Sequence, residues 1–303
     1  MFTDPNIGFG EEIPYTEVPA YEPSAQEKAY YWEIGIGLQA TDRLTPSQYL
    51  RVVADEHISG ESSYHEVLQK LSQYHSKTQT ADRQAEADFS ATKISQLLSL
   101  RSFALSVPTL IAFHAQIFKD IVGFTHPVGE LRTAHIIKPE EVLDYHSVDY
   151  TPPEFIQHSL DYLFAQEQKK DYRQLVTADR VASIQRFISD VWAVHPFREG
   201  NTRTIAAFTI AYLGSLGSVA SNEPFYHHAR YFRDALVLAN APYGMRNNAF
   251  LSKFMANVFL GGAHRLNRAE MLAVESSADA NRNRSHVSVK FLGRFQYLQE
   301  IRG

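Results

Sequence analysis

The chain contains no cysteine among its 303 residues. This absence excludes disulfide bonds, a thiolate nucleophile and every metal site that depends on cysteine ligands. A chain without disulfides is compatible with a reducing compartment, and we expect a cytoplasmic protein.

An excess of positive charge and long apolar runs are also missing. The 29 Lys and Arg residues face 34 Asp and Glu residues, so the balance favours neither nucleic acid nor an anionic membrane as a partner. No apolar run approaches the roughly 20 residues that span a bilayer. The N-terminus lacks the basic stretch and apolar core of a signal peptide. The dinucleotide fingerprint G-x-G-x-x-G, the Walker A sequence and the nucleophile motif G-x-S-x-G are absent as well.

Helical periodicity dominates what is present. From Ser24 onward apolar residues recur at helical spacing, first at Tyr30, Ile34 and Leu38. Two further short helices are expected from "LTPSQYLRVVADEHI" and "SGESSYHEVLQKLSQY". Longer amphipathic helices are expected over residues 87–101, 107–122, 153–166, 178–194, 202–216, 227–240 and 247–261. The predicted fold class is therefore all-α.

Composition changes along the chain indicate four regions. Residues 1–23 carry prolines and acidic residues without a period, which predicts a flexible arm. Residues 24–78 form a module of short helices, and residues 79–265 form the main helical domain. Residues 266–303 are a C-terminal extension that we expect to be partly flexible. One stretch breaks the helical trend, because residues 130–153 hold two extended runs around a Pro-Glu-Glu turn and predict a β-hairpin.

The most informative stretch is "AVHPFREGNTRTIAAF", residues 193–208. An apolar helical stripe ends at His195, and the following Pro196 disfavours further helix. A second helix begins at about Thr202, so Gly200, Asn201 and Thr202 lie at its N-terminus. Free backbone N–H groups and the helix dipole favour an anion there, and glycine lets the backbone approach it closely.

The polar side chains around this turn suit phosphate chemistry. Arg203 can donate charged hydrogen bonds to phosphate oxygens, and Glu199 is placed to hold a Mg²⁺ that bridges phosphates. His195 can accept a proton from a nucleophilic hydroxyl, since its pKa is the nearest to neutrality. The stretch therefore predicts a site for transfer from a magnesium nucleotide.

The same residues carry a family resemblance. "HPFREGNTRT" resembles the signature of the Fic (filamentation induced by cAMP) family, H-x-F-x-(D/E)-G-N-(G/K)-R-x-x-R. The resemblance covers about residues 85–262. The predicted hairpin lies where the family has its flap, and "YFRDALVLAN" resembles the later helix that lines the pocket for the nucleotide base. The resemblance implies a compact helical bundle with a small β-hairpin flap.

The activity implied by the resemblance is transfer of AMP from Mg-ATP to a Tyr, Ser or Thr hydroxyl of a target protein. His195 would be the general base, Glu199 would bind Mg²⁺ and Arg203 would contact a phosphate. The anion hole would be formed by Gly200, Asn201 and Thr202. Phe197 would anchor the loop in the core, and Asn240 would lie near the base or ribose. The edge of the flap would bind the target segment by β-strand addition.

Two positions depart from the family pattern. Thr202 stands where a small or basic residue is usual, and the second arginine of the pattern falls on Ala206. The substitution removes a charged donor for the terminal phosphate, worth about 1.5–3 kcal/mol. Arg230 or Arg233 could replace it. The nucleotide used, and the way in which it binds, are therefore left open.

The N-terminal helices resemble the antitoxin-type module of the family. Its inhibitory pattern is (S/T)-x-x-x-E-(G/N), and on that alignment Leu38 takes the first position while Asp42 and Arg43 take the last two. Two interpretations follow: Asp42 regulates the site, or the helices simply cover an apolar face of the main domain.

The sequence thus predicts a protein adenylyltransferase that uses ATP as substrate and Mg²⁺ as cofactor. A transferase for another nucleotide or for phosphate is the first alternative, and a catalytically weak nucleotide-binding or interaction module is the second. The expected partners are a nucleotide and a target protein with an accessible hydroxyl, and the tyrosine-rich chain itself is one candidate target. No nucleic acid or membrane is expected to take part.

Overall fold

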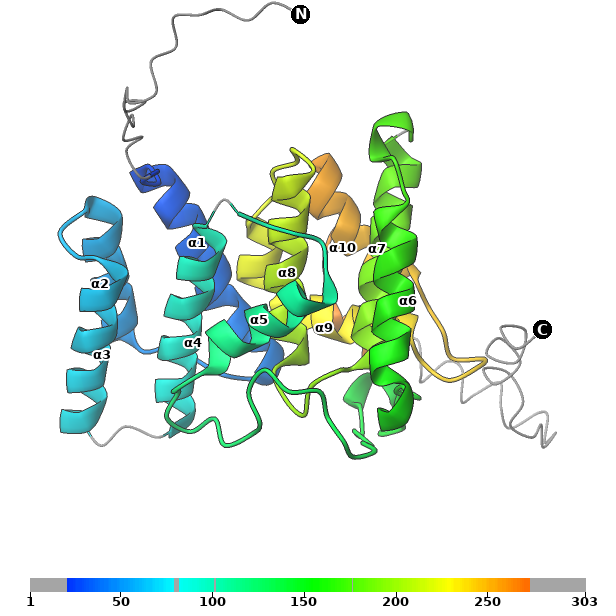
Figure 1. The fold of residues 1–303 in the computed structure, drawn as a ribbon, viewed down its shortest axis with the longest axis horizontal. Helices are drawn as coiled ribbons and strands as arrows, with labels where there is room; N and C mark the ends of the chain where they lie inside the picture. Colours follow the sequence, from blue (N-terminus) through cyan, green and yellow to red (C-terminus); the bar gives the residue numbers. More distant parts are fainter. Residues whose placement is uncertain (1–20, 79–81, 101, 176, 273–303) are drawn as a thin grey trace, which may run out of the picture.

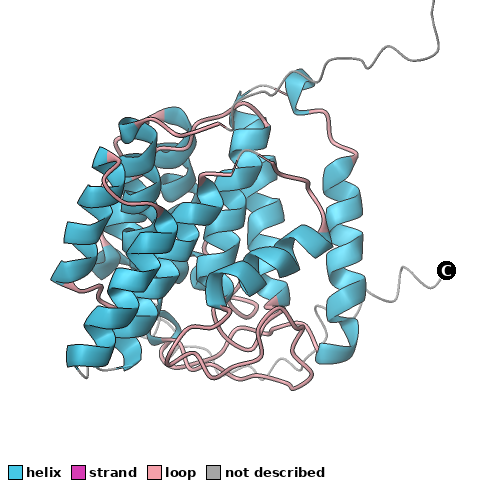
Figure 2. Cartoon of the chain, turned by 60° about the vertical axis from the view of Figure 1, so that its left-hand side comes forward, coloured by secondary structure: helices cyan, strands magenta, loops and turns pink. Residues whose placement is uncertain are grey.

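A computed structural model describes residues 21–78, 82–100, 102–175 and 177–272. Within these ranges all regular secondary structure is helical (Figure 2). The predicted all-α class is therefore confirmed. Most of the predicted arm and of the C-terminal extension lies outside the described residues. No helix in the described ranges combines the length and the apolar character needed to cross a membrane.

The N-terminal part consists of short capped helices. Helix α1 (Ala25–Gly37) begins at Ser24, whose side chain and that of Glu27 form a reciprocal capping box, and it continues into the 3₁₀ helix η1 (Leu38–Asp42). Helix α2 (Gln48–Ser59) begins at Ser47, whose hydroxyl accepts from the Leu50 amide, and α3 (Tyr64–Thr78) follows. The expected short helices are all present.

Helix α1 is wedged between helices α4 and α9, and its two glycines explain how. A Cβ on Gly35 would lie 2.4 Å from the Ala91 carbonyl oxygen of α4, and one on Gly37 would lie 2.4 Å from the Tyr226 Cα of α9. Both positions therefore require glycine, because the backbones approach too closely for any side chain. The two glycines weaken the isolated helix but permit this packing.

The main domain surrounds helix α8. The helices of the main domain are α4 (Asp82–Leu98), α5 (Val107–Phe118), α6 (Ile156–Gln168), α7 (Thr177–Val194), α8 (Asn201–Ser215), α9 (Glu223–Ala239) and α10 (Ala249–Leu260). Helix α8 contacts α4, α5 and α7, and its first ten residues are all buried (Figure 1). A helix buried on every side is typical of the centre of a bundle. Its N-terminus is thus fixed from all directions.

Helix α1 belongs to both apolar clusters of the molecule. Ile34 and Leu38 lie in the large core of the main domain, whereas Trp32 and Ile36 lie in a smaller cluster with α2 and α3. The indole N–H of Trp32 donates to Nδ1 of His57 at 3.0 Å, which satisfies both buried groups. The N-terminal helices therefore do cover an apolar face of the core, as one interpretation of the sequence proposed.

The predicted β-hairpin flap is wrong. Residues 130–152, called the flap segment below, contain only the 3₁₀ helix η2 (Glu141–Leu143) at their tip. The two arms share the Glu140 N–H to His146 carbonyl bond and the Lys138 N–H to Ser147 hydroxyl bond, but no strand ladder forms. Pro139 has no N–H to donate to a strand ladder. Val142 and Leu143 at the tip are buried in the core. The short 3₁₀ helix η3 (Pro153–Phe155) then leads into α6.

Candidate functional site

A cavity of about 570 Å³ opens at the junction of α7 and α8. Its walls come from η1, the start of α4, the flap segment, α9 and the segment that follows α10. Of the sequence-predicted site residues, His195, Glu199, Asn201, Thr202 and Arg203 line it together. Residues from distant parts of the chain thus meet where the motif lies.

The backbone of His195 adopts a strained conformation. Its φ of 51° lies in the left-handed region, directly after α7 ends at Val194. Arg132 holds this turn from the flap segment: its Nε donates to the His195 carbonyl at 2.8 Å and its Nη2 to the Val194 carbonyl at 3.3 Å. The buried guanidinium also donates to the carbonyls of Ala134 and Thr151. One arginine therefore fixes both the end of α7 and the base of the flap segment.

His195 is buried, with only 3% of its surface exposed, and the centroid of its ring lies 4.2 Å from that of the Tyr150 ring. Neither ring nitrogen has a hydrogen-bond partner among the described residues. Burial, together with the charges of Lys138 and Arg132, lowers the pKa of His195 well below its usual value. The ring is therefore neutral at neutral pH and can accept a proton.

Phe197 anchors the loop as predicted. It is fully buried and stacks on the His114 ring of α5, with centroids 3.9 Å apart. His114 accepts from the Gly129 N–H at Nδ1 and donates from Nε2 to the Glu199 carbonyl at 3.1 Å. Burial lowers the pKa of His114 to about 4, which matches this neutral donor and acceptor role. His114 thus links the loop to α5 and to Gly129, which directly precedes the flap segment.

The turn into α8 depends on the backbone conformation of Gly200 and on hydrogen bonds from the Asn201 side chain. Gly200 has φ 77°, and a Cβ there would lie 2.4 Å from the Phe118 ring. The Asn201 amide bridges the loop, because Oδ1 accepts from the Phe197 N–H at 2.9 Å and Nδ2 donates to the Phe197 carbonyl at 2.8 Å. Asn201 therefore holds the loop with its side chain and offers its backbone to the cavity.

Thr202 is explained by its neighbour Trp192. The indole N–H of Trp192, which is buried in α7, donates to the Thr202 hydroxyl at 3.0 Å. Glycine at this position would leave that N–H without a partner, at a cost of about 1–3 kcal/mol. The departure from the signature is thus a structural contact between α7 and the first turn of α8.

Glu199 directly precedes Gly200, Asn201 and Thr202, the predicted anion nest, of which Asn201 and Thr202 line the cavity. Its Oε2 is 3.4 Å from Lys138 Nζ of the flap segment, and its Oε1 accepts from the Gly200 N–H at 3.1 Å. Burial alone would raise the pKa of Glu199, but Lys138 and the Gly200 N–H outweigh it and leave the pKa below its usual value. Glu199 is therefore an ionised carboxylate facing a cation.

This donor set fits Mg²⁺ supplied with a nucleotide. Among the described residues no group of three or more His, Asp or Glu side chains could hold a metal ion by itself. Mg²⁺ commonly uses one or two carboxylates together with substrate phosphates and waters. One ionised carboxylate beside an anion nest satisfies that requirement, and Lys138 marks a position that a cation favours.

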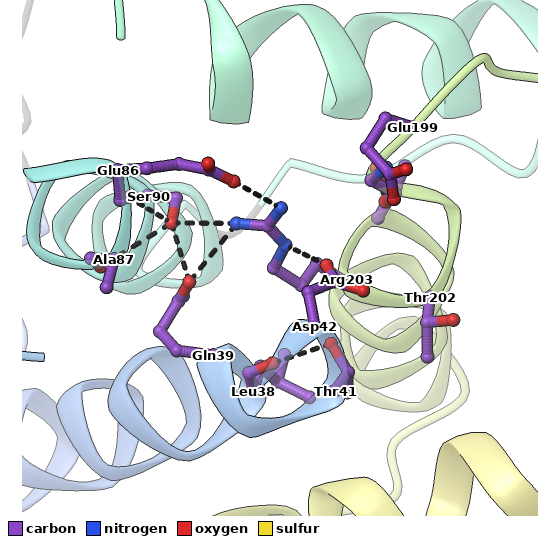
Figure 3. Close-up of polar contacts among 12 residues, drawn as sticks. Leu38, Gln39, Thr41, Asp42, Glu86, Ala87, Ser90, Glu199, Thr202 and Arg203 are labelled. Carbon is purple, nitrogen blue, oxygen red and sulfur yellow. Dashed lines mark hydrogen bonds and ion pairs between the residues drawn. The ribbon is translucent and has the colours of Figure 1, made fainter. Parts of the chain in front are cut away.

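Arg203 is the most enclosed charge in the cavity, at 1% exposure (Figure 3). Its Nε lies 2.6 Å from Asp42 Oδ2 of η1, and its Nη2 lies 2.7 Å from Glu86 Oε1 of α4. Its Nη1 donates to Gln39 and to Ser90, both at 3.2 Å, and the guanidinium also lies 4.7 Å from the centre of the Phe118 ring. The arginine expected to hold a phosphate is therefore held by two carboxylates.

Comparison with known proteins identifies the domain that carries this site. The sequence model of the Fic/DOC family matches residues 104–213, from just before α5 to within α8, and so includes His195 through Arg203. Residues 104–213 form a Fic/DOC family domain. The family suspected from the signature is confirmed. The search of curated proteins found no similar protein.

Solved structures similar to this chain include Fic-domain effectors from Bartonella. BepC of Bartonella tribocorum, solved with bound AMPPNP, is 14% identical over 57% of this chain and 85% of its own, with a TM-score of 0.45. The N-terminal Fic domain of Bep8 from Bartonella sp. 1-1C is 13% identical over 60% and 88%, with a TM-score of 0.47. The type IV secretion system effector BepA is 18% identical over 68% and 69%, with a TM-score of 0.41. These similarities are low, and the assignment rests on the matched segment.

The position of the missing second arginine lies outside the cavity of the Fic/DOC domain. Ala206 is fully buried in the apolar core of α8 and does not line the site. Arg230 and Arg233, the two candidates to replace that arginine, do line it from α9. Arg233 lies 2.8 Å from Glu140 and Arg230 lies 3.1 Å from Glu141, so both contact the flap segment.

Asn240 is not brought into the cavity. Its amide donates to the Ser189 hydroxyl at 2.9 Å and to the Leu236 carbonyl at 2.9 Å, at the end of α9. This arrangement joins α9 to α7 and gives no support for a contact with a nucleotide. A role for Asn240 near the base or ribose remains a prediction.

Sequence reasoning missed four side chains of the site. Two of them, Arg132 and Lys138, lie in the segment that is predicted to be a hairpin. His114 lies on the apolar helix α5, and Glu86 lies in the polar stretch that indicates a domain boundary. None has a motif around it. Their only signal is spatial, because each touches the loop from His195 to Arg203 from another element.

Proposed function

We propose that the chain is a protein adenylyltransferase that transfers AMP from Mg-ATP to a hydroxyl of a target protein. The observation that carries the proposal is the His195 ring. It is neutral and buried, both its nitrogens lack partners among the described residues, and it faces the cavity that holds Glu199, Arg203 and the N-terminus of α8.

The transfer needs a base and an anion site side by side. The target oxygen attacks the α-phosphorus, the bond from that phosphorus to the oxygen bridging to the β-phosphorus breaks, and pyrophosphate leaves. The hydroxyl proton passes to a ring nitrogen of His195. The first-turn N–H groups of α8 lack helical acceptors and stabilise the charge on the phosphates. Arg132 positions His195 by holding its carbonyl.

Magnesium belongs to the proposed reaction through Glu199. This carboxylate and the nucleotide phosphates would hold Mg²⁺, which would supply positive charge to the triphosphate. The Glu199 carboxylate forms an ion pair with Lys138 in the structure, and this pair would have to break before Mg²⁺ binds.

The target segment would bind along the flap segment. Ile137 in this segment is 82% exposed, and it directly precedes Lys138, which lines the cavity.

We further propose that the contact of Asp42 and Glu86 with Arg203 restrains nucleotide binding. A phosphate that reaches Arg203 must compete with two carboxylates that are already in place. Asp42 thus acts on the first arginine of the signature, because the second is absent. Residues 24–78 would regulate the site through η1 while they cover the core.

The second candidate function is a nucleotide-binding or interaction module without significant turnover. It is favoured by the charge balance of the cavity, where nearly every cation already contacts a carboxylate: the contacting cations are Arg43, Lys138, Arg203, Arg230, Arg233 and Arg268. These carboxylates reduce the attraction between the cavity and an incoming triphosphate. Transfer of a different nucleotide or of a phosphate group remains open for the same reason.

Intact-mass spectrometry tests the proposal directly. The protein is incubated with Mg-ATP, and a mass gain of one AMP is expected for the wild type and not for His195→Ala. Asp42→Asn/Glu86→Gln is included as a released form, together with the other nucleoside triphosphates. Nucleotide binding without any mass gain, on the chain or on proteins added to it, would support the module instead.

A further inference from the structure

A second group of charges lines the same cavity as Arg203, around the tip of the flap segment. Three guanidinium groups converge there on a single oxygen, Glu141 Oε2 at the tip of the flap segment. Arg268 Nη2 lies at 2.6 Å, Arg230 Nη2 at 3.1 Å and Arg43 Nη2 at 3.4 Å. We call Arg43, Arg230 and Arg268 the arginine triad.

The triad carries more positive charge than its carboxylates neutralise. Arg268 also contacts Asp234, but Arg43 and Arg230 have Glu141 as their only carboxylate partner among the described residues. The pKa of Arg230 lies below its usual value because of burial and of the charges of Arg268 and Arg43. Like charges repel at these distances, so a further anion bound at the triad would be stabilising.

One member of the triad, Arg268, is held in place independently of Glu141. Asp234 is almost fully buried on α9 and contacts both Arg268 and Arg233. Arg230 comes from the same helix, and Arg43 ends η1 with φ 57°. The site is therefore built by elements outside the flap segment, and the flap segment supplies only the anion.

Glu141 itself can leave without disturbing the fold. Its side chain is 38% exposed, whereas the adjacent Val142 and Leu143 are fully buried and hold the tip. A rotation of the Glu141 side chain would free the triad while the backbone stays in place. A carboxylate that is half in solvent exchanges easily for another anion.

We propose that the arginine triad binds the terminal phosphate of the substrate nucleotide, and that Glu141 occupies this phosphate site until the nucleotide arrives. The proposal rests on the proposed function, since it assigns one part of the same cavity. A terminal phosphate offers three oxygens and about two negative charges, which suit three guanidinium donors better than one carboxylate does. The triad would thereby take the place of the second arginine of the Fic signature, whose position is Ala206 in this chain.

The test compares nucleotides of different phosphate number. Binding of α,β-methylene-ATP, ADP and AMP, all with Mg²⁺, is measured by calorimetry on the full chain. For Arg230→Gln and Arg268→Gln, affinity for the triphosphate should fall on the order of tenfold or more, as expected when a hydrogen bond to a charged group is removed. Glu141→Gln should tighten it several-fold. Binding of AMP should stay unchanged in all three.

Matched controls separate the site from general electrostatics. Arg173→Gln makes the same charge change at an exposed pair with Asp171, and Glu56→Gln removes a carboxylate that pairs with Lys70. Neither residue lines the cavity, and neither variant should alter triphosphate affinity. Thermal unfolding confirms that each variant is folded.

The remaining outcomes are decisive as well. Equal loss of AMP and triphosphate binding in the triad variants, or no loss of either, would overturn the assignment. If the wild type binds no nucleotide, the proposed function fails, and inorganic tripolyphosphate then tests the triad alone. Tripolyphosphate binding that Arg230→Gln weakens would uphold the phosphate site with free polyphosphate as its ligand, and absence of such binding would reject it.

Discussion

The two ends of the cavity hold arginines against carboxylates in very different ways. At the α8 end, Arg203 is 1% exposed and fixed by Asp42, Glu86, Gln39 and Ser90, all on helical elements. At the flap end, Glu141 is 38% exposed and begins the short 3₁₀ helix η2. A buried ion pair is costly to break because a lone charge is left in a low-dielectric interior, whereas an exposed pair exchanges with water and ions.

This difference indicates separate tasks for the two ends. The α8 end is preorganised and rigid, and its opening requires η1 to release Arg203. The flap end already resembles a site that exchanges one anion for another. Asp42 and Arg43 are adjacent at the end of η1, and they contact Arg203 and Glu141 respectively, so this short helix links the two groups of charges.

The largest expected effect is the loss of stability when the arginine at the α8 end is replaced, compared with the same replacement at the flap end. Arg203→Met leaves Asp42 and Glu86 without their cation, and we expect a loss of about 3 kcal/mol in the free energy of unfolding. Arg230→Met removes a partly exposed contact and should cost less than about 1 kcal/mol. Urea denaturation measures both, and equal costs would remove the distinction between the ends.

The rigidity of the α8 end can be tested at Gly200. Gly200→Ala combines a φ of 77° with a clash against the Phe118 ring, and we expect a loss of about 2–3 kcal/mol. Gly244→Ala is the matched control, because its φ is 87° but a Cβ there meets no atom within 4 Å. That control should lose only about 1 kcal/mol. Thermal unfolding of the pair measures the contribution of the Phe118 contact, which would be negligible if both variants lose the same stability.

Release of Arg203 should appear as tighter nucleotide binding. Asp42→Asn removes one of its two carboxylates, and affinity for Mg-ATP should rise on the order of tenfold, the factor that about 1.4 kcal/mol represents. Asp171→Asn, at an exposed pair with Arg173, is the control and should leave the affinity unchanged. If Asp42→Asn binds nucleotide as the wild type does, η1 does not restrain the site.

The smallest expected effect is a displaced pH profile. His195 must be neutral to act as base, and burial, Lys138 and Arg132 lower its pKa in the free protein. Activity at low substrate concentration should therefore decline only below the usual histidine pKa of about 6.5. The negative triphosphate opposes those cations, so the acid limb of kcat should lie at higher pH than that of kcat/KM. Coincident limbs near pH 6.5 would indicate an exposed base and contradict the buried arrangement.

Much of the fold and part of the site could be predicted from local patterns. The seven long helices follow apolar periodicity, and the turn from His195 to Asn201 follows from Pro196 and Gly200, which act on their own backbone and on their neighbours. The hairpin prediction rested on two extended runs around a Pro-Glu-Glu turn in residues 130–153. It failed because Pro139 and the burial of Val142 decided the outcome. Local propensity was overruled by packing.

The sequence by itself determined the helices, the family signature and the clustering of His195, Glu199 and the Gly200-Asn201 turn at the start of α8. Those features arise from residues a few positions apart. Only the tertiary structure decided that Arg132 holds His195, that Asp42 and Glu86 hold Arg203, and that Arg43, Arg230 and Arg268 meet on Glu141. Charges that lie far apart along the chain interact only once packing has placed them within a few ångströms and removed the water between them.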